Sequence, residues 1–245
     1  MHLLLLSNST NHASGYLEHA LPEVIEFLGG AHLTFVPYAL ADHGAYTEKV
    51  HAALAPHGVE VTGLHTASDP MASLEAAEAV FVGGGNTFRL LDALQRLGLE
   101  DPLRARVHSG MPYMGASAGT NIAGATVRTT NDMPIVQPAS FDALGLVPFQ
   151  LNPHYLDADP TSIHQGETRA TRLAEFLEEN DAAVLGLREG TWLRVEGGEA
   201  TIGGRAVNPA APGPALLFER GAAGSELSGD VSMLLSRTPR FDVRA

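Results

Sequence analysis

The sequence predicts an α/β fold in which a mainly parallel sheet is flanked by helices and followed by a β-hairpin. Short apolar runs alternate with longer amphipathic stretches along most of the chain, as strands and crossover helices do in parallel sheets. Nearer the C-terminus, two short apolar stretches flank the turn sequence EGGE at 196–199, which is typical of a hairpin. A length of 245 residues with 44% hydrophobic content suffices for one large core, so we predict a single domain over residues 1–245.

The predicted elements follow from these runs in chain order. The first strands are expected at Leu3–Leu6, Leu33–Val36, Val59–Leu64, Val80–Val82 and Pro112–Met114. Helical spacing of apolar residues predicts helices at Gly15–Leu28, Tyr46–Leu54, Met71–Ala77 and Thr87–Leu97. Later elements are a helix at Arg169–Glu179, a buried strand at Ala182–Leu187, a hairpin of Trp192–Val195 with Ala200–Ile202, and a strand at Ala215–Phe218.

Composition excludes several classes of function. Lys and Arg number 15 against 28 Asp and Glu, a formal charge of −13, and no basic run is present, so we expect neither nucleic acid nor a membrane surface as partner. The absence of cysteine removes disulfides, thiolate zinc sites and a cysteine nucleophile. The opening MHLLLL is too short for a signal sequence or a membrane span, so we expect a soluble cytoplasmic protein. Whether it forms a homodimer stays open.

The pentapeptide Gly115-Ala116-Ser117-Ala118-Gly119 follows the predicted strand at 112–114. G-x-S-x-G between a strand and a helix is the nucleophile-elbow pattern, in which flanking glycines permit a sharp turn that lifts the serine hydroxyl out of the sheet. The alternative interpretation is that Ser117 is simply a small residue at a point where a strand and a helix pack closely. The nucleophile interpretation gains weight if a base and an acid lie at neighbouring strand ends, where ligands gather in such sheets.

His154 is the candidate base among eleven histidines. It follows the apolar segment 149–151, and Pro153 is expected to end any regular strand, so the imidazole would sit on a rigid loop at a strand end. Two carboxylates compete to orient it. Glu189 directly follows the predicted strand at 182–187, whereas Asp132 would give the chain order Ser, Asp, His of α/β-hydrolases. Its place at the carboxyl end of a strand favours Glu189 as the triad acid. Asp132 would then shape the pocket or bind the substrate amine.

A glycine loop follows the strand at 80–82 and supplies donors for an oxyanion. The backbone amides of Gly84 or Gly85, together with that of Ala118, are the expected oxyanion hole. The loop matches neither G-x-G-x-x-G nor the P-loop with its lysine, which argues against a nucleotide. A metal site of His154, Asp157 and Asp159 has no supporting ligand spacing, so no metal is expected.

Sequence blocks along most of the chain can be compared with known families. The blocks are LLLLSNST at the start, VGGGNTF at 82–88, GxSAGxN at the elbow, RTTNDMPIV at 128–136, FDALGL at 141–146, NPH at 152–154, GETR at 166–169 and GxxEGxW at 186–192. Together they resemble the peptidase E family of α-aspartyl dipeptidases, serine peptidases on a fold related to class I glutamine amidotransferases.

The resemblance implies that the substrates are small peptides, namely dipeptides with an N-terminal aspartate, and that their hydrolysis needs no metal or cofactor. It assigns the nucleophile to Ser117 and the base to His154, and it leaves both Glu189 and Asp132 as triad acids. One departure is Ala116, where family members often have tryptophan, and another is the segment 157–159. Either departure is a place where the substrate range could differ.

Aspartate specificity requires a cation for the substrate carboxylate. Arg169, at the start of a helix beside the His154 loop, is the first choice, because a guanidinium binds a carboxylate with two parallel hydrogen bonds. Arg172 and Arg128 are alternatives, and Asn86 and Asn131 are further candidate substrate-binding residues. Two rival functions stay open: a cyanophycinase-like hydrolase of β-aspartyl bonds, and a binding protein that kept the fold without activity.

Overall fold

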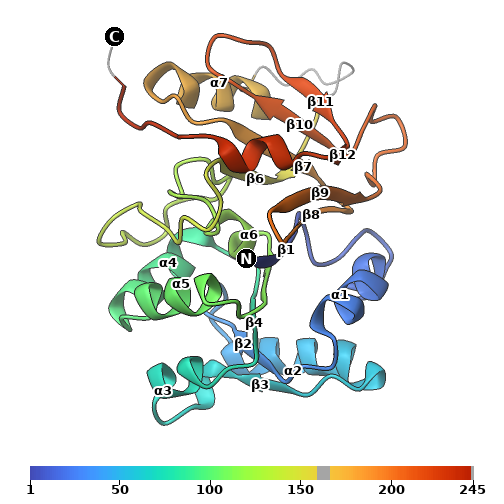
Figure 1. Ribbon diagram of the computed structural model, residues 1–245, viewed down its shortest axis with the longest axis vertical. Coiled ribbons are helices and arrows are strands. Elements are labelled where there is room, and N and C mark those ends of the chain that lie inside the picture. The colour runs from blue at the N-terminus through green and yellow to red at the C-terminus, as the bar shows by residue number, and fades with distance from the viewer. Residues whose placement is uncertain (159–165, 244–245) are drawn as a thin grey trace.

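Two sheets form the framework of the protein. The computed structural model describes residues 1–158 and 166–243 (Figure 1). The larger sheet has eight strands in the order β12-β9-β8-β1-β5-β4-β2-β3, and the smaller has four in the order β11-β10-β7-β6. Their bounds are β1 His2–Leu6, β2 Leu33–Val36, β3 Val61–Gly63, β4 Ala79–Val82, β5 Tyr113–Ala116, β6 Gln150–Tyr155, β7 Val184–Arg188, β8 Thr191–Glu196, β9 Glu199–Gly204, β10 Ala215–Phe218, β11 Ser225–Leu227 and β12 Gly229–Asp230.

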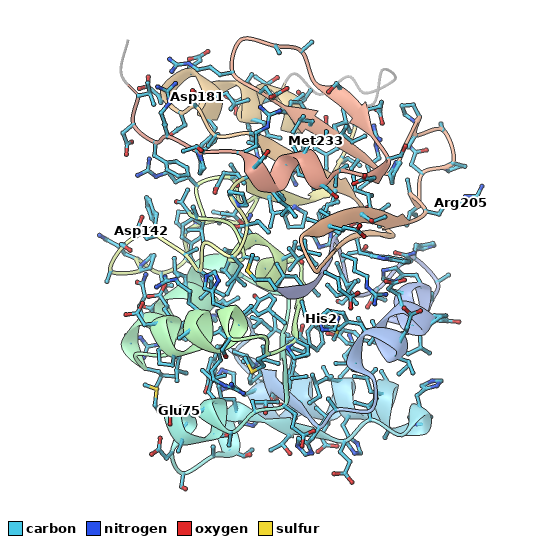
Figure 2. All side chains as sticks on the ribbon, in the orientation of Figure 1. His2, Glu75, Asp142, Asp181, Arg205 and Met233 are labelled. Atoms are coloured by element: carbon cyan, nitrogen blue, oxygen red, sulfur yellow. The ribbon has the colours of Figure 1, made fainter. Side chains whose placement is uncertain are left out.

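Helices cover both faces of the parallel part of the larger sheet (Figure 1). The α-helices are α1 Leu21–Leu28, α2 His43–Leu54, α3 Pro70–Glu75, α4 Thr87–Arg96, α5 Glu100–His108, α6 Ala118–Asn121 and α7 Arg169–Glu179. In β1, Leu3 and Leu5 join the apolar cluster that contains α4 and α5, whereas Leu4 and Leu6 join the cluster that contains α1 and α2. Burial on both faces explains why this strand is an unbroken apolar run. Side chains fill the space on both sides of the sheet (Figure 2).

Local signals account for where the helices begin. The Asp42 carboxylate accepts a hydrogen bond from the Ala45 amide and caps α2, so this helix begins before the predicted Tyr46. The Asn86 side chain caps α4 in the same way, through the amide of Arg89. The helix predicted from Gly15 begins at Leu21, where Pro22 occupies the first turn.

The predicted hairpin and the α/β class are confirmed, but the smaller sheet was not predicted. The strands β8 and β9 pair around Gly197 and Gly198, and β8 adds antiparallel to β1 at the side opposite β5. In the smaller sheet, β6 and β7 are parallel, and α7 packs Leu173 and Leu177 on one face of it. Within residues 1–158 and 166–243, no helix has the length and apolar character to cross a membrane.

Candidate active site

Ser117 lies at a strained turn between β5 and α6. Its backbone has φ 53° and ψ −108°, a conformation that costs a non-glycine residue about 1–3 kcal/mol. The Ser117 amide donates to the Leu6 carbonyl at 3.1 Å, and the Ser117 carbonyl accepts from the Asn121 amide at 2.8 Å, so both sides of the turn are held. The elbow predicted from the pentapeptide is therefore present in the fold.

The two flanking glycines permit close packing rather than the turn itself. A Cβ atom on Gly119 would lie 2.0 Å from the Val82 carbonyl oxygen, and one on Gly115 would lie 2.5 Å from the Gly119 carbonyl oxygen. Neither glycine has a positive φ, so the unusual dihedral angles fall on Ser117. The sequence interpretation gave the strain to the glycines, and the structure corrects this: the glycines let β4, β5 and α6 approach each other.

His154 and Glu189 form a close pair at the ends of β6 and β7. Imidazole Nδ1 lies 2.6 Å from the Glu189 carboxylate, with the two side chains 39% and 48% exposed. This hydrogen bond holds the pKa of Glu189 below its ordinary value, against a smaller opposing effect of burial. Because a carboxylate only accepts, Nδ1 carries the hydrogen, and in the neutral imidazole the lone pair is therefore on Nε2.

The position of His154 differs from the prediction of a loop after a strand. Strand β6 continues to Tyr155, and its pairing with β7 shifts register between Asn152 and Tyr155, where three steps on β6 match two on β7. Pro153 and His154 occupy this bulge, and His154 has φ 53°. Pro153 thus interrupts the ladder without ending the strand, and the bulge redirects the imidazole.

Ser7 and Asn8, just after β1, hold the two segments that carry His154 and Glu189, the bulge in β6 and the turn after β7. The buried Ser7 hydroxyl accepts from the His154 amide and donates to the Leu187 carbonyl, both at 2.9 Å. The Asn8 side-chain oxygen accepts from the Gly190 amide at 2.7 Å. Sequence reasoning did not give these two residues a role. A polar pair directly after an apolar strand was the signal that could have found them.

Two cavities meet at Ser117 and His154, which line both. The first, of about 470 Å³, is also lined by Thr87, Ala118, Asn131, Asp132, Arg169 and Glu189. Asp132 does not contact the imidazole; its carboxylate accepts from the Thr87 amide at the start of α4, at 2.7 Å. Asn131 lines the same cavity, and its amide group links Asn152 to the Pro153 carbonyl. Of the two candidate acids, Glu189 is the one in contact with His154.

Among the three candidate arginines, Arg169 is the one that lines this cavity. Burial, and then the neighbouring charge of Arg172, lower the pKa of Arg169, while Asp132 opposes them. Arg172 is paired with Glu167 at 3.4 Å, and Arg128 donates two hydrogen bonds to Asp242. The cavity therefore presents a cation and an anion, Arg169 and Asp132, beside the nucleophile candidate.

The glycine loop lies against Ser117, but Asn86 at its end faces elsewhere. A Cβ atom on Gly84 would lie 3.0 Å from the Ser117 Cβ, and Gly84 and Gly85 both line the second cavity. The Asn86 side chain caps α4 and donates to the Met133 carbonyl at 2.8 Å. Asn86 is not among the residues that line either cavity, so its two polar groups hold the loop at 131–133 against α4.

At the two departures from the family pattern, the described residues Ala116 and Asp157 are not among those that line either cavity. Ala116 is fully buried in the apolar cluster that includes Leu4 and Met114. Asp157 accepts two hydrogen bonds from Arg188, both at 2.7 Å, which makes it an ion-pair partner of a buried cation. Asp159 lies outside the described residues.

Comparison with known proteins decides the family. The sequence profile of peptidase family S51 matches residues 3–203. The chain belongs to peptidase family S51. Over 245 residues, 99% of this chain and 98% of the relative, it is 61% identical to a protein of Streptomyces coelicolor named peptidase E. The prediction of a serine-type peptidase is thereby confirmed.

Two further relatives extend the comparison. The chain is 48% identical to a Drosophila melanogaster protein named "probable alpha-aspartyl dipeptidase", over 204 residues that cover 82% of this chain and 85% of the relative. The crystal structure of a peptidase from an acI-B1 actinobacterium has the same fold, with a TM-score of 0.63 at 17% identity and 93% coverage of each chain.

Proposed function

We propose that this S51 peptidase hydrolyses dipeptides with an N-terminal aspartate through an acyl-enzyme on Ser117. The observation that carries the proposal is the first cavity, in which Arg169 and Asp132 lie beside Ser117 and the His154–Glu189 pair. The names of the relatives, peptidase E and alpha-aspartyl dipeptidase, agree with it.

Substrate recognition follows from the charges of this cavity. An N-terminal aspartyl residue presents a side-chain carboxylate and an ammonium group. Arg169 binds the carboxylate, since a guanidinium matches its two oxygens, and Asp132 accepts from the ammonium. Asn131 holds the strand end that carries His154 in place through its bond to the Pro153 carbonyl. An uncharged first residue gives Arg169 no carboxylate to bind, and glutamate places its carboxylate one methylene further from the scissile bond, so we expect both to be poorer substrates than aspartate.

The chemistry uses Ser117, His154 and Glu189 in sequence. His154 Nε2 takes the hydroxyl proton as Ser117 Oγ attacks the aspartyl carbonyl, and Glu189 stabilises the imidazolium. The imidazolium then gives its proton to the leaving amine as the C–N bond breaks. Water, deprotonated by His154, attacks the ester and releases aspartate and free Ser117. The proton transfer requires Ser117 Oγ and His154 Nε2 to lie within hydrogen-bond distance in the complex with substrate, and both side chains line the cavity that we assign to it.

Backbone amides around Ser117 stabilise the oxyanion. The Ala118 amide lies in the first turn of α6, where it has no partner within its own helix. Gly84 or Gly85 supplies the second donor from the loop against Ser117, and the Gly84 amide also lies beside the Tyr46 hydroxyl. Two such donors are worth several kcal/mol of transition-state stabilisation, about 3 kcal/mol for one.

A panel of dipeptides that differ in the first residue tests the proposal. Asp-Leu, Asn-Leu, Glu-Leu and β-Asp-Leu are assayed with the wild type and with Ser117→Ala. We expect cleavage of Asp-Leu alone, and none by a folded Ser117→Ala variant. Preferred cleavage of the β-linked substrate favours the cyanophycinase-like alternative. Failure of both cleavage and labelling of Ser117 by a fluorophosphonate supports a binding protein instead.

Location and assembly stay predictions from the sequence. We propose that the protein acts in the cytoplasm on small peptides, where their turnover takes place. Cell fractionation with an antibody tests the location, and light scattering at several concentrations tests the homodimer that the sequence left open.

A further inference from the structure

The second cavity, of about 560 Å³, leaves Ser117 and His154 in a direction distinct from that of Arg169 and Asp132. The N-cap residue Asp42 and one face of α2 line it, the latter with Ala45, Tyr46 and, one turn further on, Lys49. The Tyr16 and Tyr46 rings meet edge to face, and their hydroxyls lie 3.2 Å apart. The cavity thus has an aromatic wall that begins at Gly84, beside Ser117.

Lys49 is the single lysine of the 245-residue chain, and it lines this cavity. Its Nζ lies over the Tyr16 ring, 4.8 Å from the centroid, a position that keeps the ammonium at the cavity without neutralising it. Within residues 1–158 and 166–243, no carboxylate forms an ion pair with it. The nearby Asp42 carboxylate accepts from the Ala45 amide as the cap of α2.

Each cavity therefore holds one lysine or arginine side chain: Arg169 in the first and Lys49 in the second. An aspartyl dipeptide carries two carboxylates, one on the aspartate side chain and one at its C-terminus, on opposite sides of the scissile bond. In a protein of net charge −13, two local cations placed on either side of a nucleophile match this arrangement.

From this match we infer that the second cavity binds the leaving amino acid, with Lys49 paired to its terminal carboxylate and the Tyr16–Tyr46 wall packed against its side chain. The inference rests on the proposed function, because it places the aspartyl half in the first cavity. His154 lines both cavities and can therefore protonate the departing amine. An aromatic wall can pack against many apolar side chains, so the second amino acid of the dipeptide is recognised more by its terminal carboxylate than by its side chain.

The test compares Asp-Leu with Asp-Leu amide, which differ only in the terminal charge. We expect wild-type kcat/KM to be about five- to tenfold higher for Asp-Leu, mainly through KM, and this ratio to fall close to one in Lys49→Met. Lys49→Arg keeps most of the ratio because it keeps the charge. Glu48→Gln, an exposed neighbour on α2, is the matched control and keeps the wild-type ratio.

A second readout does not depend on turnover. Because the chain has one lysine, an amine-selective acetylating reagent modifies Lys49 and the terminal amine, and mass spectrometry separates the two. In the Ser117→Ala variant, we expect Asp-Leu to protect Lys49 and Asp-Leu amide to protect it less. Equal protection by the two, or an Asp-Leu to amide ratio that Lys49→Met leaves at the wild-type value, overturns the inference. Absence of any Asp-Leu cleavage by the wild type instead contradicts the proposed function.

Discussion

Ser7→Ala removes a hydroxyl that joins the two sheets at the candidate active site. Ser7 is fully buried and makes two hydrogen bonds of 2.9 Å, one from the His154 amide and one to the Leu187 carbonyl. At about 1–1.5 kcal/mol for each bond, its loss should lower the free energy of unfolding by about 2–3 kcal/mol.

The same change should reduce activity through His154. The left-handed backbone of His154 costs about 1–2 kcal/mol, which is comparable to the hydrogen bond that Ser7 gives it. Without that bond the bulge relaxes, and the imidazole moves from its 2.6 Å contact with Glu189. We therefore expect kcat for Asp-Leu to fall by about tenfold or more, with a smaller change in KM.

Urea unfolding and steady-state kinetics on the same preparations measure both effects. Ser7→Thr, which keeps the hydroxyl, should recover activity if the β-carbon has room for a methyl group. Ser236→Ala is the control, because its hydroxyl is exposed and donates to the Met233 carbonyl within the same short helical segment. A Ser7→Ala variant with the wild-type unfolding midpoint and wild-type kcat would refute the reasoning.

Three further changes test other parts of the site. Arg169→Met should lower kcat/KM for Asp-Leu by about 10- to 100-fold, whereas Arg172→Met, whose arginine is paired with Glu167, should have little effect in the same assay. Glu189→Gln should lower kcat by about two to four orders of magnitude. The pKa of Glu189 in the folded protein lies below its ordinary value of 4.5, so the ionised carboxylate stabilises the folded state fully above pH 4.5. This stabilisation is lost as the pH falls through the lower, folded-state pKa. The urea midpoint of the wild type should therefore drop more on acidification than that of Glu189→Gln. Gly119→Ala should lower the free energy of unfolding, measured in urea, by about 1–3 kcal/mol, since its Cβ would clash with the Val82 carbonyl. Gly44→Ala on α2 is the control, because its Cβ would lie at an ordinary contact distance of 3.7 Å from Asp42 Oδ1.

The sequence predicted the parts of the site that depend on local pattern. The elbow at Ser117, the glycine loop beside it and the Glu189 position after β7 all follow from residues near in sequence to a strand end. Each is found where the pattern placed it. The glycine loop and Ser117 follow β4 and β5, which are parallel neighbours in the larger sheet, so their carboxyl ends lie at one edge. Glu189 follows β7 of the smaller sheet, so the local pattern placed it at a strand end but not beside Ser117.

The parts that depend on distant contacts were not predictable from one sequence. Ser7 is 147 residues from His154 and 180 from Leu187, and no periodicity encodes those contacts. The division into two sheets depends on which strands pair, and runs of similar apolar residues do not specify it. The bulge at His154 follows from a register that only the pairing of β6 with β7 defines.

Side chains with two possible roles were the hardest to assign. An asparagine after a glycine loop suits either a ligand site or a helix cap, and Asn86 is a cap. Asp132 suits either a triad or a helix N-terminus, and its carboxylate contacts the Thr87 amide. In both cases the distinction is a matter of a few ångströms, which residue type and spacing do not fix.

The most direct test of the central claim is the covalent state of Ser117 during turnover. Wild-type protein mixed with Asp-Leu is quenched in acid within milliseconds and digested, and the peptide that contains Ser117 is analysed by mass spectrometry. We predict an aspartyl ester on Ser117 that disappears as the substrate is consumed and is absent from Ser117→Ala. Rapid hydrolysis of Asp-Leu by the Ser117→Ala variant would contradict the account.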